Sequence, residues 1–157
     1  MPINTDSYTS IAEADAYWAD RNDSVWSGLT DEQKTAGLIR ATEWIDNSFT
    51  WIGKIAVSTQ KLNWPRQNVV DNQGREIAND TIPESLKNAV AWLAAEAYNK
   101  ELSPALKRGG AIDRLKAGSV EVQYNSAAPG NTTYNHLFRI LKNLIVGSKT
   151  TRKLVRT

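Results

Sequence analysis

The residues that follow Pro83 form the strongest helical pattern in the chain. Proline is tolerated in the first turn of a helix, because its missing amide hydrogen would have no helical partner there. Apolar side chains then recur every three or four residues, which places them on one face of a helix. They are Leu86, Val90, Leu93, Ala94 and Ala97. Other elements have to cover such a face, so we expect this helix at the centre of a mainly α fold.

Two capping boxes mark the starts of further helices. In this motif the side chain of a Ser or Thr accepts a hydrogen bond from the backbone amide of the third residue after it. That third residue is a Glu or Gln, whose side chain accepts in turn from the backbone amide of the Ser or Thr. Ser10 with Glu13 has this spacing, and so has Thr30 with Gln33. We therefore expect helices over residues 11–21 and 31–47.

The C-terminal part of the chain carries one β pattern and one more helical pattern. Val120, Val122 and Tyr124 alternate with polar residues after a glycine turn, which predicts a β-hairpin over about 112–125. Leucines at helical spacing then predict a last amphipathic helix over 134–146.

The expected fold is therefore mainly α, with about four helices, a small β-hairpin near the C-terminal end and an extended basic C-terminal tail. The chain of 157 residues fits a single domain, which we place at 1–147, with the tail at 148–157. The connection 56–81 has little periodicity, and loops of such length tend to be functional or to carry small strands. Its residues 72–74 are typical of a hairpin tip.

Composition excludes several kinds of chemistry. Cysteine is absent and His136 is the single histidine, so disulfides, thiolate metal sites, cysteine nucleophiles and two-histidine metal sites are ruled out. No apolar run approaches the ~18 residues of a membrane helix, and the first residues do not resemble a secretory signal. We expect no membrane contact.

No catalytic motif is found either. Four acids lie close together in sequence, but without the spacing of a calcium loop; they are Glu13, Asp15, Asp20 and Asp23. Gly109-Gly110 lacks the Lys and Ser or Thr of a phosphate loop. We expect no enzyme, no cofactor and no metal, and we keep a small hydrolase only as a third hypothesis.

Charge is divided unevenly along the chain. Residues 1–100 hold 9 Lys and Arg against 14 Asp and Glu, a net −5, whereas residues 101–157 hold 10 against 3, a net +7. One copy's basic end would suit a neighbour's acidic body, as in a head-to-tail ring.

The last residues are basic and contain no acid. The cations are Lys149, Arg152, Lys153 and Arg156, and Leu154 and Val155 lie between them. Such a tail is either a solvated end, an arm on a nucleic-acid backbone, or a peptide-like strap that docks on a protein. The two apolar residues favour the strap, because an arm for DNA alone would not need them.

Trp64-Pro65-Arg66 is the unusual feature of the long connection. An aromatic ring beside a guanidinium is able to stack on a base of single-stranded DNA. The alternative, which we favour, is that Trp64 anchors the loop on the core while Pro65 fixes its exit. All three residues are candidates for a loop contact.

The chain resembles a group of tailed-phage proteins, the head-to-tail adaptor or head-completion proteins, which also carry the description DnaT-like single-stranded-DNA-binding proteins. The likeness runs in order along nearly the whole chain. It rests on Tyr8-x-Ser10-x-x-Glu13-Ala14-Asp15-Ala16-Tyr17, Trp26, Leu38-Ile-Arg-Ala-Thr42, Trp64-Pro65-Arg66, Ile82-Pro83, Val120-Glu-Val-Gln-Tyr124 and the C-terminal Leu-Val-Arg.

The resemblance implies a structural connector of a bacteriophage virion. Copies would form a ring, expected to be a dodecamer, below the portal protein, extend the channel for the double-stranded genome, and hold the next tail or head-completion protein. The tail would bind the portal through Lys149, Arg152, Lys153, Leu154, Val155 and Arg156. The protein would lie at the head–tail interface of the virion, and in the host cytoplasm during assembly. The alternative is a DnaT-like replication accessory protein that binds single-stranded DNA.

Overall fold

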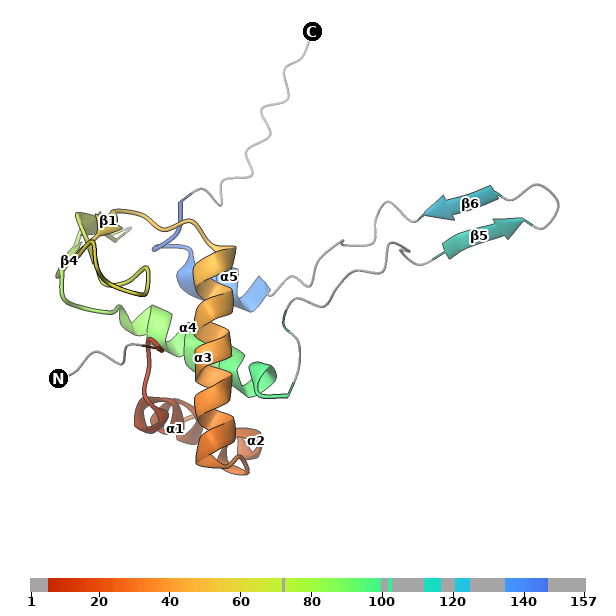
Figure 1. Ribbon diagram of the computed structural model, residues 1–157, viewed down its shortest axis with the longest axis horizontal. Helices are drawn as coiled ribbons and strands as arrows, with labels where there is room; N and C mark the ends of the chain where they lie inside the picture. The colour runs from red at the N-terminus through yellow and green to blue at the C-terminus, as the bar shows by residue number, and fades with distance from the viewer. Residues whose placement is uncertain are drawn as a thin grey trace, which may run out of the picture.

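The computed structural model describes residues 6–71, 73–99, 102, 112–116, 121–124 and 135–146. Within them the chain forms five helices, and α4 lies at their centre (Figure 1). They are α1 (Ile11–Ala19), α2 (Ser24–Ser27), α3 (Asp31–Ser48), α4 (Glu84–Ala97) and α5 (Asn135–Leu141). Helix α4 packs against α1, α3 and α5. The mainly α fold and the central place of the helix after Pro83 are confirmed.

Both capping boxes are formed. The Ser10 amide donates to the Glu13 carboxylate at 2.8 Å, and the Glu13 amide donates to the Ser10 hydroxyl at 3.3 Å. At the start of α3, the Thr30 amide donates to the Gln33 side chain at 2.9 Å, and the Gln33 amide donates to the Thr30 hydroxyl at 3.4 Å. The predicted starts of these helices are therefore correct, because local hydrogen bonding fixes them.

Helices α3 and α4 cross in close contact at Gly37. A Cβ atom at this position would lie 2.7 Å from the Ala94 carbonyl oxygen. The facing side of α4 is rich in alanine and almost wholly buried. Small residues on both helices thus let the two backbones approach, and side chains from both then fill the core.

The connection between α3 and α4 is built from two short antiparallel pairs. Strands β1 (Lys54–Ile55) and β2 (Arg66–Gln67) form one, and β3 (Val69–Val70) and β4 (Glu76–Ile77) form the other. The predicted hairpin is confirmed by the pairing of β3 with β4, and of its predicted tip the structure describes residues 73 and 74. Gly53 is required, because it has a φ of +71° and a Cβ there would lie 2.6 Å from the Gln67 carbonyl oxygen.

Two boundaries differ from expectation. The segment 23–28, between the two expected helices 11–21 and 31–47, contains the one-turn helix α2, because the Asp23 side chain caps it by accepting from the Val25 amide at 2.8 Å. The last helix ends at Leu141 rather than at 146. Beyond it the backbone pairs with the start of the long connection, through a bridge between Trp51 and Ile145.

The C-terminal hairpin is confirmed in the backbone. Strands β5 (Ile112–Lys116) and β6 (Glu121–Tyr124) pair antiparallel, with Ile112 opposite Tyr124 and a register irregularity between Ile112 and Arg114. The tail 148–157 lies outside the described residues. In the described part of the chain, no helix has the length and apolar character needed to cross a membrane.

Candidate functional site

Trp64 lies in the core. Its side chain is 1% exposed, and its ring meets the ring of Trp51 edge to face at a centroid distance of 5.9 Å. Pro65 is buried as well. The indole therefore has no accessible face for a base, and it anchors the loop as the alternative interpretation had it. A contact of this loop with a ligand stays a prediction.

Arg66 is committed to the backbone of its own loop. Its guanidinium donates to the carbonyl oxygens of Ile52, Gly53 and Asn63 at 2.7, 2.9 and 3.1 Å. These bonds satisfy carbonyl groups that a helix or sheet would otherwise pair. The residue is 9% exposed, so its charge is not presented to solvent as a free binding group.

A buried hydroxyl and a partly buried carboxylate connect the N-terminal segment to the same loop. The Tyr8 hydroxyl donates to the Asp46 carboxylate and accepts from the Trp64 amide at 3.2 Å. Burial, followed by the bond to Asp46, raises the pKa of Tyr8. Burial also raises the pKa of Asp46 above its ordinary value, although bonds from Tyr8 and Asn63 oppose that shift. These bonds connect the N-terminal segment, α3 and the loop.

Two of the four acids singled out in the sequence, Glu13 and Asp15, are engaged in ordinary ion pairs. Glu13 accepts from Lys87 at 2.7 Å, and Asp15 accepts from Lys34 at 2.8 Å. The Trp26 indole also donates to Asp15, at 2.7 Å. Among the described residues, no group of three or more metal-binding side chains comes together. The absence of enzymatic activity stays a prediction.

The outer face of α5 is the described surface that combines an exposed aromatic ring with cations. Phe138 is 39% exposed, and its ring packs edge-on against Phe49 at a centroid distance of 5.0 Å. Arg139 and Lys142 are exposed beside it. Neither cation forms a salt bridge with a described residue. We call Phe138, Arg139 and Lys142 the α5 surface.

The helix itself explains why these residues face outward. Leu137, Leu141 and Leu144 are 0%, 0% and 2% exposed and pack into the core. With about 3.6 residues per turn, Phe138, which follows Leu137, is turned toward solvent, and so is Lys142, which follows Leu141 directly after the end of α5. The ring of Phe138 packs on Phe49, which is itself buried.

The α5 surface opens a stretch of uniform charge. From residue 135 to the end, the chain carries six Lys and Arg and no Asp or Glu. Four of the six are the tail cations, which lie outside the described residues. The exposed aromatic ring thus lies at the start of the most basic part of the chain.

Sequence reasoning did not select the α5 surface. The leucine stripe of the last helix was recognised, and the residues outside that stripe were the available signal. The sequence pattern singled out Trp64 and Arg66 as candidate contact residues, but the structure shows that both side chains are buried and that Arg66 is hydrogen-bonded within its own loop. Periodicity was therefore a better guide to which side chains are exposed than the residue types were.

A family model described as "Putative DnaT-like ssDNA binding protein" matches residues 2–157. Neither a curated protein nor a solved structure matches the chain. The DnaT-like part of the resemblance is therefore confirmed over nearly the whole length.

The expected function as a head-to-tail connector is wrong. The matching family is described by single-stranded DNA binding, and no named relative supports a role in a virion. The expected partners fall with it: the portal protein, the next tail or head-completion protein, the dodecameric ring and the double-stranded genome in a channel. The physical reason lies in the motifs, since Tyr8, Trp26 and Trp64 are buried. Such residues specify how the chain folds and carry no information about what it binds.

Proposed function

Because this chain belongs to the family of DnaT-like single-stranded-DNA-binding proteins, we propose that it binds single-stranded DNA through the α5 surface. The observation that carries the location is the exposed ring of Phe138 between core and solvent, with Arg139 and Lys142 beside it. Proteins that bind single strands combine such rings with cations along the backbone path.

Phe138 supplies the stacking face. Any base has a π face, so stacking on a phenyl ring tolerates sequence and contributes roughly 1–3 kcal/mol per base. The edge-on contact with Phe49 at 5.0 Å keeps the ring in place before a base arrives. A ring held in place loses less conformational entropy on binding than a free one.

Arg139 and Lys142 supply the phosphate contacts. Both are exposed and have no salt-bridge partner among the described residues, so binding a phosphate would not require a described ion pair to break. The four tail cations follow within the same chain segment and would extend the positive path. Binding of this kind depends strongly on salt, because each neutralised phosphate releases counterions.

Fluorescence anisotropy of a labelled oligothymidine, titrated with the full chain at several salt concentrations, tests the proposal. We expect the logarithm of the affinity to fall linearly with the logarithm of the salt concentration, with a slope of about −0.7 for each engaged cation. The absence of binding at the lowest salt concentration would overturn the proposed function.

A charge variant tests the location. Arg139→Gln with Lys142→Gln should reduce the steepness of the salt dependence by about 1.4, the contribution of two cations. The matched control is Lys61→Gln with Arg75→Gln, which removes two exposed cations whose ion pairs with Asp6 and Asp71 are weak. Equal losses in the two variants would show that the α5 surface is not the site.

A further inference from the structure

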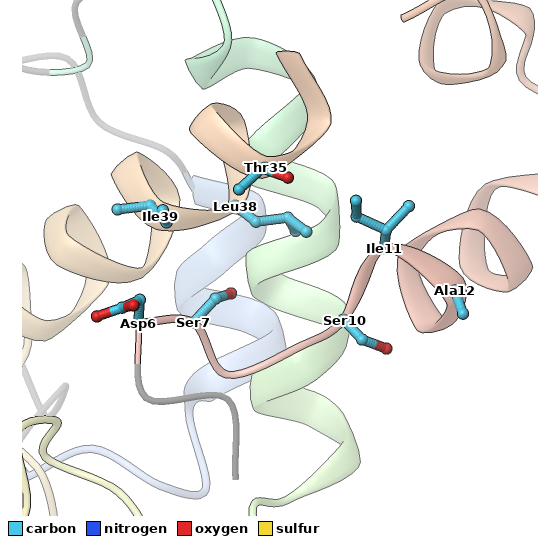
Figure 2. Close-up of a pocket in the computed structure, with 8 residues that line it drawn as sticks. All are labelled: Asp6, Ser7, Ser10, Ile11, Ala12, Thr35, Leu38 and Ile39. Carbon is cyan, nitrogen blue, oxygen red and sulfur yellow. The ribbon is translucent and has the colours of Figure 1, made fainter. Parts of the chain in front are cut away.

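A groove with an apolar floor and acidic ends runs along α3. It consists of two adjoining hollows of about 400 Å³ and about 440 Å³, which share Thr35 and Ile39. Its floor is formed by Ile11, Leu38 and Ile39, and its ends carry Asp6 on one side and Asp31 with Glu32 on the other. Figure 2 shows the wall from the N-terminal segment and the start of α1 opposite α3.

The charges of the groove are all of one sign. Its described lining contains three carboxylates and neither Lys nor Arg. Asp31 and Glu32 are exposed and form no salt bridge with a described residue, whereas Asp6 pairs with the exposed Lys61. A nucleic acid would be repelled here, and a basic segment with apolar residues would be attracted.

The chain contains one segment with the matching pattern. Arg152-Lys153-Leu154-Val155-Arg156 places two apolar residues between cations. We propose that in the chain without DNA the groove holds this segment, with Leu154 and Val155 on the apolar floor, so that single-stranded DNA would compete with the groove for the same tail cations. The cations on either side then lie at the acidic ends.

The chain is long enough for this path. Val146, the last described residue, donates its amide to the Thr50 carbonyl at 2.7 Å, so the tail starts just past the C-terminal end of α3. Leu154 lies eight residues further on and reaches up to about 27 Å in extended chain. Ile39 on the groove floor precedes Thr50 by eleven residues, which corresponds to about 16 Å along a helix. This distance is shorter than the reach of the tail.

The order of charges along the path also agrees. The Thr42 hydroxyl donates to the Ser7 hydroxyl at 3.2 Å, so the neighbouring Asp6 lies toward the end of α3 from which the tail arrives. Arg152 and Lys153 would therefore meet the Asp6 end first. Arg156 would meet the far end, where Asp31 and Glu32 lie.

A spin label at the end of the full chain tests the docking without DNA, so its outcome is independent of the proposed function. Because cysteine is absent, Thr157→Cys gives a single attachment point. We expect the label to cause a loss of peak intensity for the methyl groups of Ile11 and Ile39. It should leave those of Ile77, on β4, unaffected.

Tail variants separate docking from folding, because they change no residue of the helical body. Leu154→Ser with Val155→Ser should abolish the intensity loss at Ile11 and Ile39, and the matched control Thr150→Ser with Thr151→Ser should keep it.

Variants of the groove test its acidic end. Asp31→Asn with Glu32→Gln should reduce the intensity loss, whereas the control Glu76→Gln with Asp80→Asn should leave it unchanged. Unaffected Ile11 and Ile39 methyls in the labelled parent chain would overturn the proposal. So would an intensity loss that arises only between separate chains in a mixture of labelled and isotope-enriched protein, which would assign the groove to a second copy's tail.

Discussion

Two regions of the molecule pair an aromatic ring with a guanidinium, and they use the pair in opposite ways. In the long connection, Trp64 is 1% exposed and Arg66 donates to three carbonyl oxygens. On α5, Phe138 is 39% exposed and Arg139 lies in solvent. The same residue chemistry therefore stabilises the fold in one region and is available to a ligand in the other. Burial and hydrogen bonding, rather than the residue types, make the difference.

The largest expected effect comes from the buried ring. Trp64→Ala should lower the free energy of unfolding by roughly 3–5 kcal/mol, because it removes a fully buried side chain and leaves a cavity. Denaturant unfolding followed by circular dichroism measures this loss.

Trp64→Phe is the informative companion. It keeps an aromatic ring and removes an indole N–H that has no hydrogen-bond partner among the described residues, so it should destabilise the chain much less than alanine does. A loss of stability equal to that of Trp64→Ala would contradict the assignment of Trp64 as a packing residue.

The buried guanidinium gives the next effect. Arg66→Gln should lower the free energy of unfolding by roughly 1–3 kcal/mol, because carbonyl groups of the loop lose their donors. Arg139→Gln, the matched change on α5, should leave the unfolding free energy nearly unchanged and weaken DNA binding. Paired unfolding and binding curves for both variants check this. If Arg66→Gln left stability intact, the contrast between the regions would fail.

The exposed ring gives an effect of a different kind. Phe138→Ala should weaken binding of an oligonucleotide by roughly 1–3 kcal/mol, the contribution of one stacked base, with a smaller loss of stability because the ring is partly in solvent. Phe138→Trp should retain binding. Val57→Ala, which shortens another exposed apolar side chain, serves as the control in the same anisotropy assay. Parallel losses in Phe138→Ala and Val57→Ala would remove Phe138 from the site.

The smallest effect concerns pH and a contact outside both regions. Burial of Glu13 favours a higher pKa, but hydrogen bonds from Lys87 and Ser10 outweigh it and lower the pKa of Glu13 from 4.5 to about 2. A carboxyl group whose pKa is lower in the folded state than in the unfolded state stabilises the fold at pH values above its unfolded-state pKa. This stabilisation is lost as the pH falls toward 2. Wild type should therefore lose slightly more stability between pH 5 and pH 2 than Glu13→Gln does. Thermal unfolding across this range measures the difference, and identical pH profiles would contradict it.

Much of the helical architecture was predictable because its signals are local. Capping boxes such as Ser10 with Glu13 act within one turn, and the apolar stripe of α4 repeats over the whole helix. The end of α5 was not predictable in this way. It depends on pairing with Trp51, a residue distant in sequence.

The candidate site, too, was predictable only in the features that local sequence determines. The basic character of the C-terminal part is evident from counting charges, and it points to the end of the chain where we propose the site. The accessibility of each side chain is a tertiary property. Trp64 and Arg66 were reasonable candidates by residue type, but the bonds that occupy Arg66 join it to carbonyls of Ile52 and Gly53, which no local pattern reveals.

The central claim is that the α5 surface is where single-stranded DNA binds. The most direct measurement follows the backbone amide resonances of the full chain while an oligothymidine is added. The account predicts that the largest shifts occur at residues 136–142 and in the basic tail, and that residues 63–67 of the buried loop shift little. Shifts confined to α1–α3 or to the buried loop, or no shifts at all, would contradict it.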